Sequence, residues 1–220
     1  MTPLSSRPDR YAPIVAEARR QVLALSLEQV CAASGARLAS ASAVRAQPSP
    51  AGAAAALHLP VLDRELRMQL PEGELAWPDG TAPGTDYALV SLHYLARAAG
   101  PLAPESLVRY GGLPGAAAYA GAFEARADQP LAALLDQESA RLTETADALG
   151  TRRVDGLWGF RFFPYLPLVV RLAPAEGPLP SACVILFPRR AGYLHHVEDL
   201  AVVGQLLAGR LLELTAAGFH

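Results

Sequence analysis

The sequence predicts an α+β fold: a mostly antiparallel sheet covered by helices, with N-terminal helices and a long C-terminal helix. Strand-like segments fall into two clusters, residues 57–77 and 153–187, with helical patterns before, between and after them. The chain has 220 residues, of which 51% are hydrophobic. That is enough for one sizeable core.

Composition shifts divide the chain into three parts. They are an N-terminal helical segment over residues 1–36, an Ala/Ser/Pro-rich linker or loop over residues 37–56, and an α+β domain over residues 57–220. Apolar residues at helical spacing predict two helices within Tyr11–Ala36, the second capped by Ser26 and stopped by Gly35. The second part has no period, which is typical of a mobile linker or surface loop.

From residue 57 to residue 150 the pattern changes from strands to helices. Leu57–Trp77 alternates apolar and polar residues, which predicts an antiparallel meander of three short strands. A helix capped by Thr85 or Asp86 is apolar on nearly every side, so we expect it at the centre of the core. The elements expected next are a short helix over Pro104–Arg109, a loop over Tyr110–Gly115, and helices over Ala116–Ala127 and Pro130–Leu149.

The last third returns to strands and ends in a helix. The expected strands are Arg153–Trp158, Gly159–Phe163, Leu166–Leu172 and Ala182–Phe187. An apolar stripe over Val197–Ala216 predicts the closing helix. The pattern leaves open whether the two strand clusters join in one sheet.

Composition excludes several classes of function. All 19 basic residues are arginine, so no Schiff-base lysine, lysine-anchored pyridoxal phosphate or P-loop lysine can exist. The two cysteines, Cys31 and Cys183, cannot supply the four thiolates of an iron–sulfur cluster. A net charge of −2 with dispersed arginines argues against a nucleic-acid partner. Without a membrane-length apolar run or a signal peptide, we expect no membrane contact and a cytoplasmic location.

A turn crowded with polar side chains precedes the closing helix, and it is the first candidate site. It contains His195, His196, Glu198 and Asp199. His195 and Asp199 fall about one helical turn apart, a workable separation for two metal ligands or a His–carboxylate pair. The acidic residues also suit a helix N-terminus, so structural capping is the competing interpretation.

Two further candidates lie outside this turn. His93 is a lone histidine in the most apolar helix, and we expect it to be buried and neutral, with a structural role. Arg161 stands among aromatic residues and is expected to bind an anionic or aromatic small molecule together with Tyr165 and the loop residues Tyr110, Gly111 and Gly112. The competing interpretation is that Arg161 points to solvent.

Four segments carry a resemblance to a known family. They are Leu57–Gly80, Ser91–Leu102, Gly111–Leu135 and Cys183–Leu214. Together they resemble the bacterial domain-of-unknown-function family numbered 3786. The resemblance implies a link to anaerobes and one-carbon metabolism, and some relatives carry an added iron–sulfur region that this chain lacks.

The residues supply no nucleophile, base and orienting group in a recognisable spacing. We therefore expect a binding or accessory protein for a small molecule, a cofactor or a partner protein. The alternatives are a metal- or cofactor-dependent enzyme with its site at residues 195–199, and a structural subunit of a complex.

Overall fold

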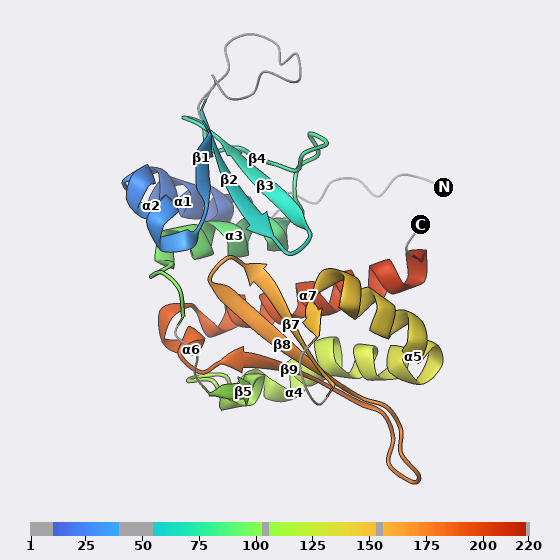
Figure 1. The fold of residues 1–220 in the computed structure, drawn as a ribbon. Helices are drawn as coiled ribbons and strands as arrows, with labels where there is room; N and C mark the ends of the chain where they lie inside the picture. Colours follow the sequence, from blue (N-terminus) through green and yellow to red (C-terminus); the bar gives the residue numbers. More distant parts are fainter. Residues whose placement is uncertain (1–10, 40–54, 103–105, 153–155, 219–220) are drawn as a thin grey trace, which may run out of the picture.

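The chain folds into two lobes, each built on its own antiparallel sheet (Figure 1). The computed structural model describes residues 11–39, 55–102, 106–152 and 156–218, and it confirms the α+β class. Helices α1 to α3 gather on the first sheet, and helices α4 to α7 surround the second (Figure 1). The two strand clusters therefore do not join in one sheet.

The first lobe has strand order β1-β2-β3-β4. Its elements are α1 (Ala12–Leu23), α2 (Leu27–Ser34), β1 (Arg37–Ala39), β2 (Ala56–Val61), β3 (Arg64–Gln69), β4 (Leu75–Ala76) and α3 (Thr85–Arg97). In β2 every second residue is buried, so Leu57, Leu59 and Val61 face the core as the alternation predicts. The predicted helices and the three-stranded meander are confirmed.

The prediction of a linker from residue 37 was wrong at both ends. Arg37–Ala39 forms β1 and pairs with the first residues of β2, beginning with Ala39 opposite Ala56. Residues 40–54 of that predicted linker lie outside the described residues. A three-residue strand has no detectable period of its own, and its partner is almost twenty residues away.

The second lobe has strand order β5-β9-β8-β7-β6. Its strands are β5 (Leu107–Arg109), β6 (Thr151–Arg152), β7 (Leu157–Phe163), β8 (Leu166–Ala173) and β9 (Ala182–Pro188). Its helices are α4 (Ala120–Phe123), α5 (Gln129–Leu149), α6 (Ala191–Leu194) and α7 (Val197–Ala217). Helical turns η2 (Tyr110–Gly112), η3 (Ala117–Tyr119) and η4 (Glu124–Asp128) join β5, α4 and α5.

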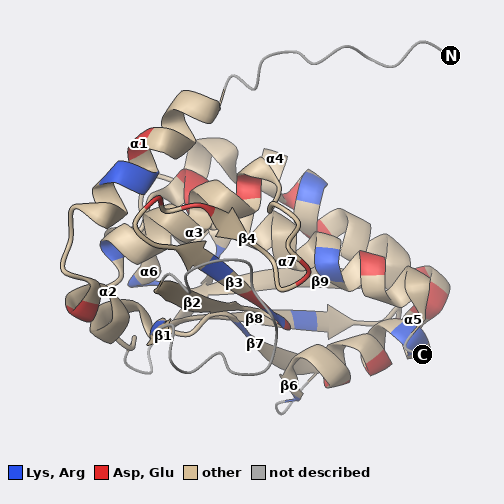
Figure 2. Ribbon diagram, turned by 90° about the horizontal axis from the view of Figure 1, so that it is seen from above, with Lys and Arg blue, Asp and Glu red and all other residues tan. Residues whose placement is uncertain are grey.

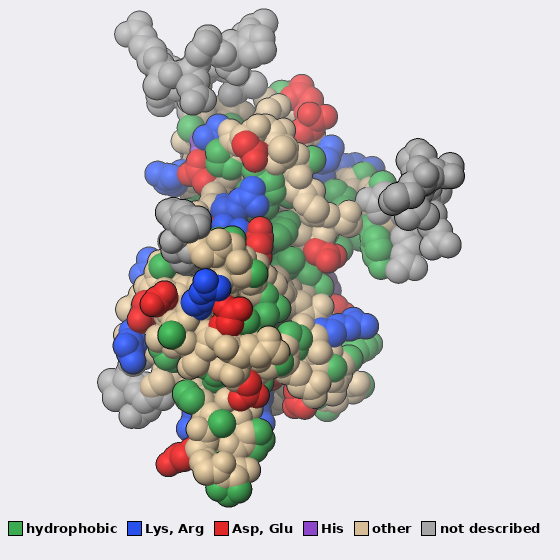
Figure 3. All heavy atoms as spheres, turned by 90° about the vertical axis from the view of Figure 1, so that its right-hand side faces the viewer, with side chains coloured by type: hydrophobic (Ala, Val, Ile, Leu, Met, Phe, Trp, Pro, Cys, Tyr) green, Lys and Arg blue, Asp and Glu red, His purple; other side chains and the backbone are tan. Residues whose placement is uncertain are grey.

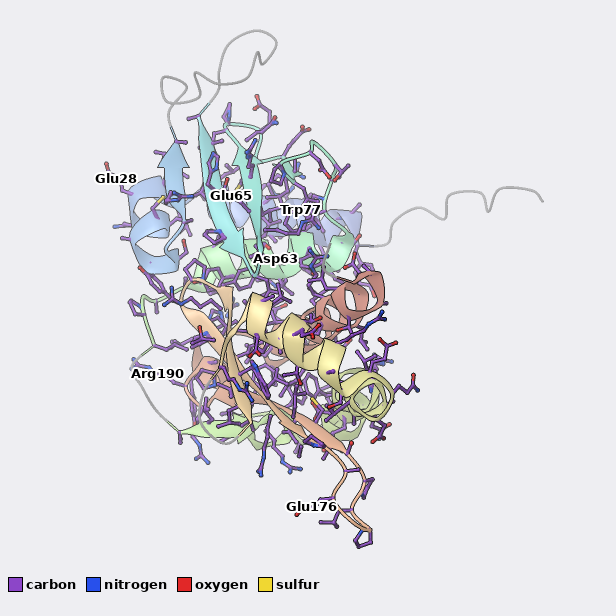
Figure 4. All side chains as sticks on the ribbon, turned by 45° about the vertical axis from the view of Figure 1, so that its right-hand side comes forward. Glu28, Asp63, Glu65, Trp77, Glu176 and Arg190 are labelled. Carbon is purple, nitrogen blue, oxygen red and sulfur yellow. The ribbon has the colours of Figure 1, made fainter. Side chains whose placement is uncertain are left out.

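Two predictions for this lobe were wrong. Where a helix was expected up to Arg109, Leu107–Arg109 is a strand, because these residues pair with the edge of β9, Val108 opposite Phe187. The two strands expected on either side of Trp158 are one strand, β7, and residues 153–155 lie outside the described part. The hairpin between β8 and β9 extends away from the body of the molecule, with Glu176 near its tip (Figure 4).

Proline explains the irregular helix between α4 and α5. Residues Glu124–Asp128 form a π-helical turn, and Pro130 follows directly in the first turn of α5. Proline has no N–H to donate and its ring crowds the carbonyl four residues earlier, so the helical ladder must widen there. This turn re-aims Asp128 towards β9, where its Oδ1 accepts the N–H of Ile185 at 3.0 Å.

Helix α7 links the two lobes. It contacts α5 in its own lobe and α3 in the first lobe, and its stripe Leu200, Val203, Leu207 and Leu211 is buried. By length and composition alone, α7 is the one helix in the described residues that could cross a membrane. Seven of its residues, including that stripe, are buried within this fold.

Candidate functional site

Helix α3 places His93 beside the first turn of α7. The Nδ1 atom of His93 lies 2.9 Å from both carboxylate oxygens of Asp199, which is 106 residues further along the chain. The His93 side chain is 22% exposed. The expectation that His93 is buried was therefore wrong, because α7 brings the Asp199 carboxylate to a partly exposed imidazole from the other lobe.

The pair fixes the orientation of the imidazole. An ionised carboxylate only accepts hydrogen bonds, so Nδ1 of His93 donates to Asp199, and Nε2 is left as the ring nitrogen for other partners. A histidine held by a carboxylate through one nitrogen and free at the other is the arrangement found in many general bases and metal ligands.

His195 and His196 lie near this pair but in different environments. His195 stacks on Tyr94 with ring centroids 5.7 Å apart, and burial lowers its pKa to about 4, so its imidazole is neutral at pH 7. His196 is exposed, and its ring centroid lies 5.9 Å from that of His93. The two adjacent histidines therefore do not act as one unit.

Tyr94 joins this cluster to both lobes. Its hydroxyl donates to the Ser34 carbonyl at 2.8 Å and accepts the Tyr165 N–H at 3.1 Å. Its ring stacks on that of Phe163, with ring centroids 4.2 Å apart. Burial raises the pKa of Tyr94. Gly35, next to Ser34, has φ +74°, and a Cβ there would lie 2.6 Å from Pro164, so the tight approach of the lobes requires glycine.

The predicted metal set receives no support from this geometry. Asp199 bonds to His93, while Glu198 and His196 are exposed. Within the described ranges, no group of three His, Cys, Asp or Glu side chains is placed to hold a metal ion. The void beside the cluster, lined by Tyr94, His195 and Asp199, has a volume of about 10 Å³, roughly the space for one water molecule.

The pocket predicted around Arg161 is not formed as expected. Arg161 is exposed, and it lines neither the void beside Tyr94 nor either of the two larger grooves between described residues. Tyr165 lies by Tyr94, whereas Tyr110 is buried elsewhere, its hydroxyl donating to the Val197 carbonyl at 3.1 Å. Gly111 and Gly112 belong to the helical turn that follows β5 rather than to a shared pocket with Tyr165.

A larger concave surface lies in the first lobe, and we call it the arginine groove. It is lined by Ala12, Val15, Ala16, Arg19, Leu75, Ala82, Pro83, Thr85 and Ala88, and its volume is about 330 Å³. Apart from Arg19 and Thr85, these side chains are small or apolar. Arg19 makes no ion pair with any described residue, and its Nε is buried without a hydrogen-bond partner.

Sequence reasoning missed Arg19, although a signal was present. Arg19 follows Val15 by four residues and precedes Val22 by three, so it occupies the apolar side of α1 rather than its solvated side. An arginine inside an apolar helical stripe is a candidate for a ligand contact. The neighbouring Arg20 is instead exposed and pairs with Glu17.

Charges of both signs are interspersed over the molecule. Viewed from above, acidic and basic residues alternate along the helices (Figure 2), and the face drawn in Figure 3 shows no broad field of one sign.

Comparison with known proteins yields one match. No curated protein and no solved structure matches the sequence significantly. A family model for a domain of unknown function, DUF3786, matches residues 34–210. That span contains both sheets, the His93–Asp199 pair and most of α7, and it begins after α1. The chain therefore belongs to the DUF3786 family.

Proposed function

We propose that the protein binds a small molecule that combines an anionic group with a compact apolar body, in the arginine groove. The observation that carries this proposal is the unpaired guanidinium of Arg19 on an otherwise apolar wall. A buried N–H without an acceptor is costly, and a carboxylate, sulfonate or phosphate on a ligand would supply acceptors to the same guanidinium.

The dimensions of the groove fit this class of ligand. A volume of about 330 Å³ lies at the lower end of the range for small-molecule sites. Such sites combine an apolar wall with a few placed polar groups, and here Val15, Leu75 and Pro83 form part of the wall. We expected this combination of an apolar wall and a polar group at Arg161. The surroundings of Arg19 fit it better.

Fluorescence titration with 8-anilinonaphthalene-1-sulfonate, an anionic aromatic probe, tests the proposal. We expect Arg19→Ala to weaken probe binding about tenfold, because a charge-assisted contact contributes on the order of 1.5 kcal/mol. Arg20→Ala is the matched control, since Arg20 is the next residue of α1 but pairs with Glu17. Equal affinities in the two variants would contradict the proposal.

An enzymatic function has one observation in its favour, the carboxylate-held imidazole of His93. If Asp199 activates that imidazole, His93 should react faster with diethyl pyrocarbonate in the parent protein than in Asp199→Asn, as measured by mass spectrometry. Equal rates would leave His93 and Asp199 as a structural pair only. The exposed His196 provides an internal reference for reagent activity.

A further inference from the structure

A second groove, the carboxylate groove, lies in the second lobe beside β9. It is lined by Arg109, Glu124, Asp128, Gln129, Ala132, Ser181, Ala182, Cys183 and Val184, and its volume is about 270 Å³. One wall is the π-helical turn that ends at Asp128, and the other is the first half of β9. π-helical turns inside longer helices are frequent at functional sites.

The strand wall of this groove is an unpaired sheet edge. On the side away from β8, the short strand β5 pairs only with Leu186, Phe187 and Pro188. On that side, no strand in the described part of the chain continues alongside Ala182–Ile185. Asp128 occupies the N–H of Ile185, and because backbone directions alternate along a strand, the N–H and C=O of Cys183 face the same groove.

The helix wall carries uncompensated negative charge. Neither Asp128 nor Glu124 forms an ion pair with a described residue, and Arg109 is the one basic side chain in the lining. Asp128 Oδ1 accepts the Ile185 N–H at 3.0 Å, while Oδ2 has no hydrogen-bond partner among those residues. Burial raises the pKa of Asp128 to about 6, against the N–H bond that lowers it, so the carboxylate is mostly ionised at pH 7.

We propose that the carboxylate groove binds an extended peptide segment that carries a basic side chain. The peptide adds a short antiparallel strand to β9 in line with β5, exchanging backbone hydrogen bonds with Cys183. Its lysine or arginine side chain contacts Oδ2 of Asp128 and the carboxylate of Glu124. The excess of two carboxylates over one guanidinium makes a basic peptide the complementary partner.

The two parts of this contact contribute differently. Backbone pairing gives affinity without regard to sequence, whereas the charge contact selects the peptide. A groove of about 270 Å³ holds only two or three residues in contact. We therefore expect a weak, transient interaction and not a permanent complex.

Fluorescence anisotropy with the full chain tests this proposal. The probe is a fluorescein-labelled pentapeptide of alternating valine and arginine, compared with the same peptide carrying glutamate in place of arginine. We expect binding of the arginine peptide only, weakened about fivefold or more by Glu124→Gln and by Asp128→Asn. The matched control is Asp136→Asn, an exposed carboxylate further along α5.

Each contrary result is decisive. Because Asp128→Asn changes a group bonded to β9, Glu124→Gln, which alters an exposed side chain, keeps the test valid if the first variant folds poorly. Unchanged affinity in Glu124→Gln, or equal binding of the glutamate peptide, overturns the charge contact. If N-methylation of alternate peptide nitrogens has no effect, no strand is added and the proposal is wrong.

Discussion

The two ends of the contact between the lobes are held by different chemistry. At one end Arg210 of α7 donates to both carboxylate oxygens of Asp63, at 2.6 and 3.2 Å. Asp63 lies in the β2–β3 turn, at the end of the first sheet that approaches the second lobe (Figure 4). At the other end His93 of α3 donates to Asp199, in the first turn of the same helix α7.

This difference gives the His93–Asp199 pair a structural interpretation as well as a functional one. Arginine remains charged at any physiological pH, so the Asp63–Arg210 end is a fixed ionic contact. The His93 imidazole instead donates from Nδ1 to Asp199 and leaves its other ring nitrogen for a ligand. Variants at the Asp63–Arg210 end measure how much a polar contact between the lobes contributes to stability. Variants at the His93–Asp199 end can then be compared with that contribution.

The largest effect should come from the apolar contact between these two ends. Phe162 is fully buried, and its ring stacks on that of Tyr87 in the first lobe, with ring centroids 6.4 Å apart. The Phe162 carbonyl accepts the Leu62 N–H at 3.0 Å. We expect Phe162→Ala to lower the free energy of unfolding by about 3–5 kcal/mol. Urea denaturation measures it, with Leu179→Ala in the exposed β8–β9 hairpin as control. A loss below about 1 kcal/mol would show that the lobes do not depend on this contact.

The next effect concerns the histidine end. Asp199→Ala should cost about 1–3 kcal/mol, because it leaves the partly buried Nδ1 of His93 without an acceptor. Glu198→Ala is the control, since Glu198 shares the first turn of α7 but is exposed. A double-mutant cycle with His93→Ala isolates the pair energy. Strict additivity would mean that the two side chains do not stabilise each other.

The ionic end should contribute less. The Asp63 and Arg210 side chains are 27% and 17% exposed, so we expect a coupling energy of about 1 kcal/mol from the Asp63→Ala and Arg210→Ala cycle. This energy should fall in 1 M salt, because screening acts on a partly exposed pair. The Glu138–Arg141 pair on α5 is more exposed and should give a smaller coupling. A larger value there would contradict the ranking.

Local sequence patterns predicted most of the helices and strands. Pairing between residues far apart in the sequence determined the rest. The closing helix was expected at Val197–Ala216 and runs over Val197–Ala217, because a stripe of apolar residues defines its buried side. Strand β5 was taken for a helix, because its identity depends on β9, almost eighty residues later. A three-residue segment is given its structure by its partner and not by its own period.

The same limit applied to the candidate sites. Asp199 was selected correctly as a polar residue to examine, but its partner is His93 and not His195, since the α3–α7 contact is invisible in sequence. Asp128 was not predicted as a site residue, because the sequence alone shows neither the widened turn before Pro130 nor the unpaired edge of β9. Arg19 could have been found from its place in the stripe of α1.

The smallest predicted effect concerns His195, next to the histidine end. Burial lowers its pKa to about 4; the nearby Asp199 carboxylate opposes that shift, whereas Arg97 and His196 favour it. In the unfolded chain the pKa returns to about 6.5. Below that pH the unfolded chain binds a proton that the folded protein excludes, so stability falls as the pH drops from about 6.5 towards 4.

Between pH 7 and pH 6 this loss should be roughly 0.7 kcal/mol. His195→Phe keeps a ring against Tyr94 but has no proton to bind, so its stability should depend less on pH over the same interval. NMR titration of the His195 ring measures the pKa directly, and His196, which is exposed, serves as the comparison in the same spectrum. If His195 titrates near 6.5, its ring is hydrated, and the histidine end of the contact between the lobes is open to water.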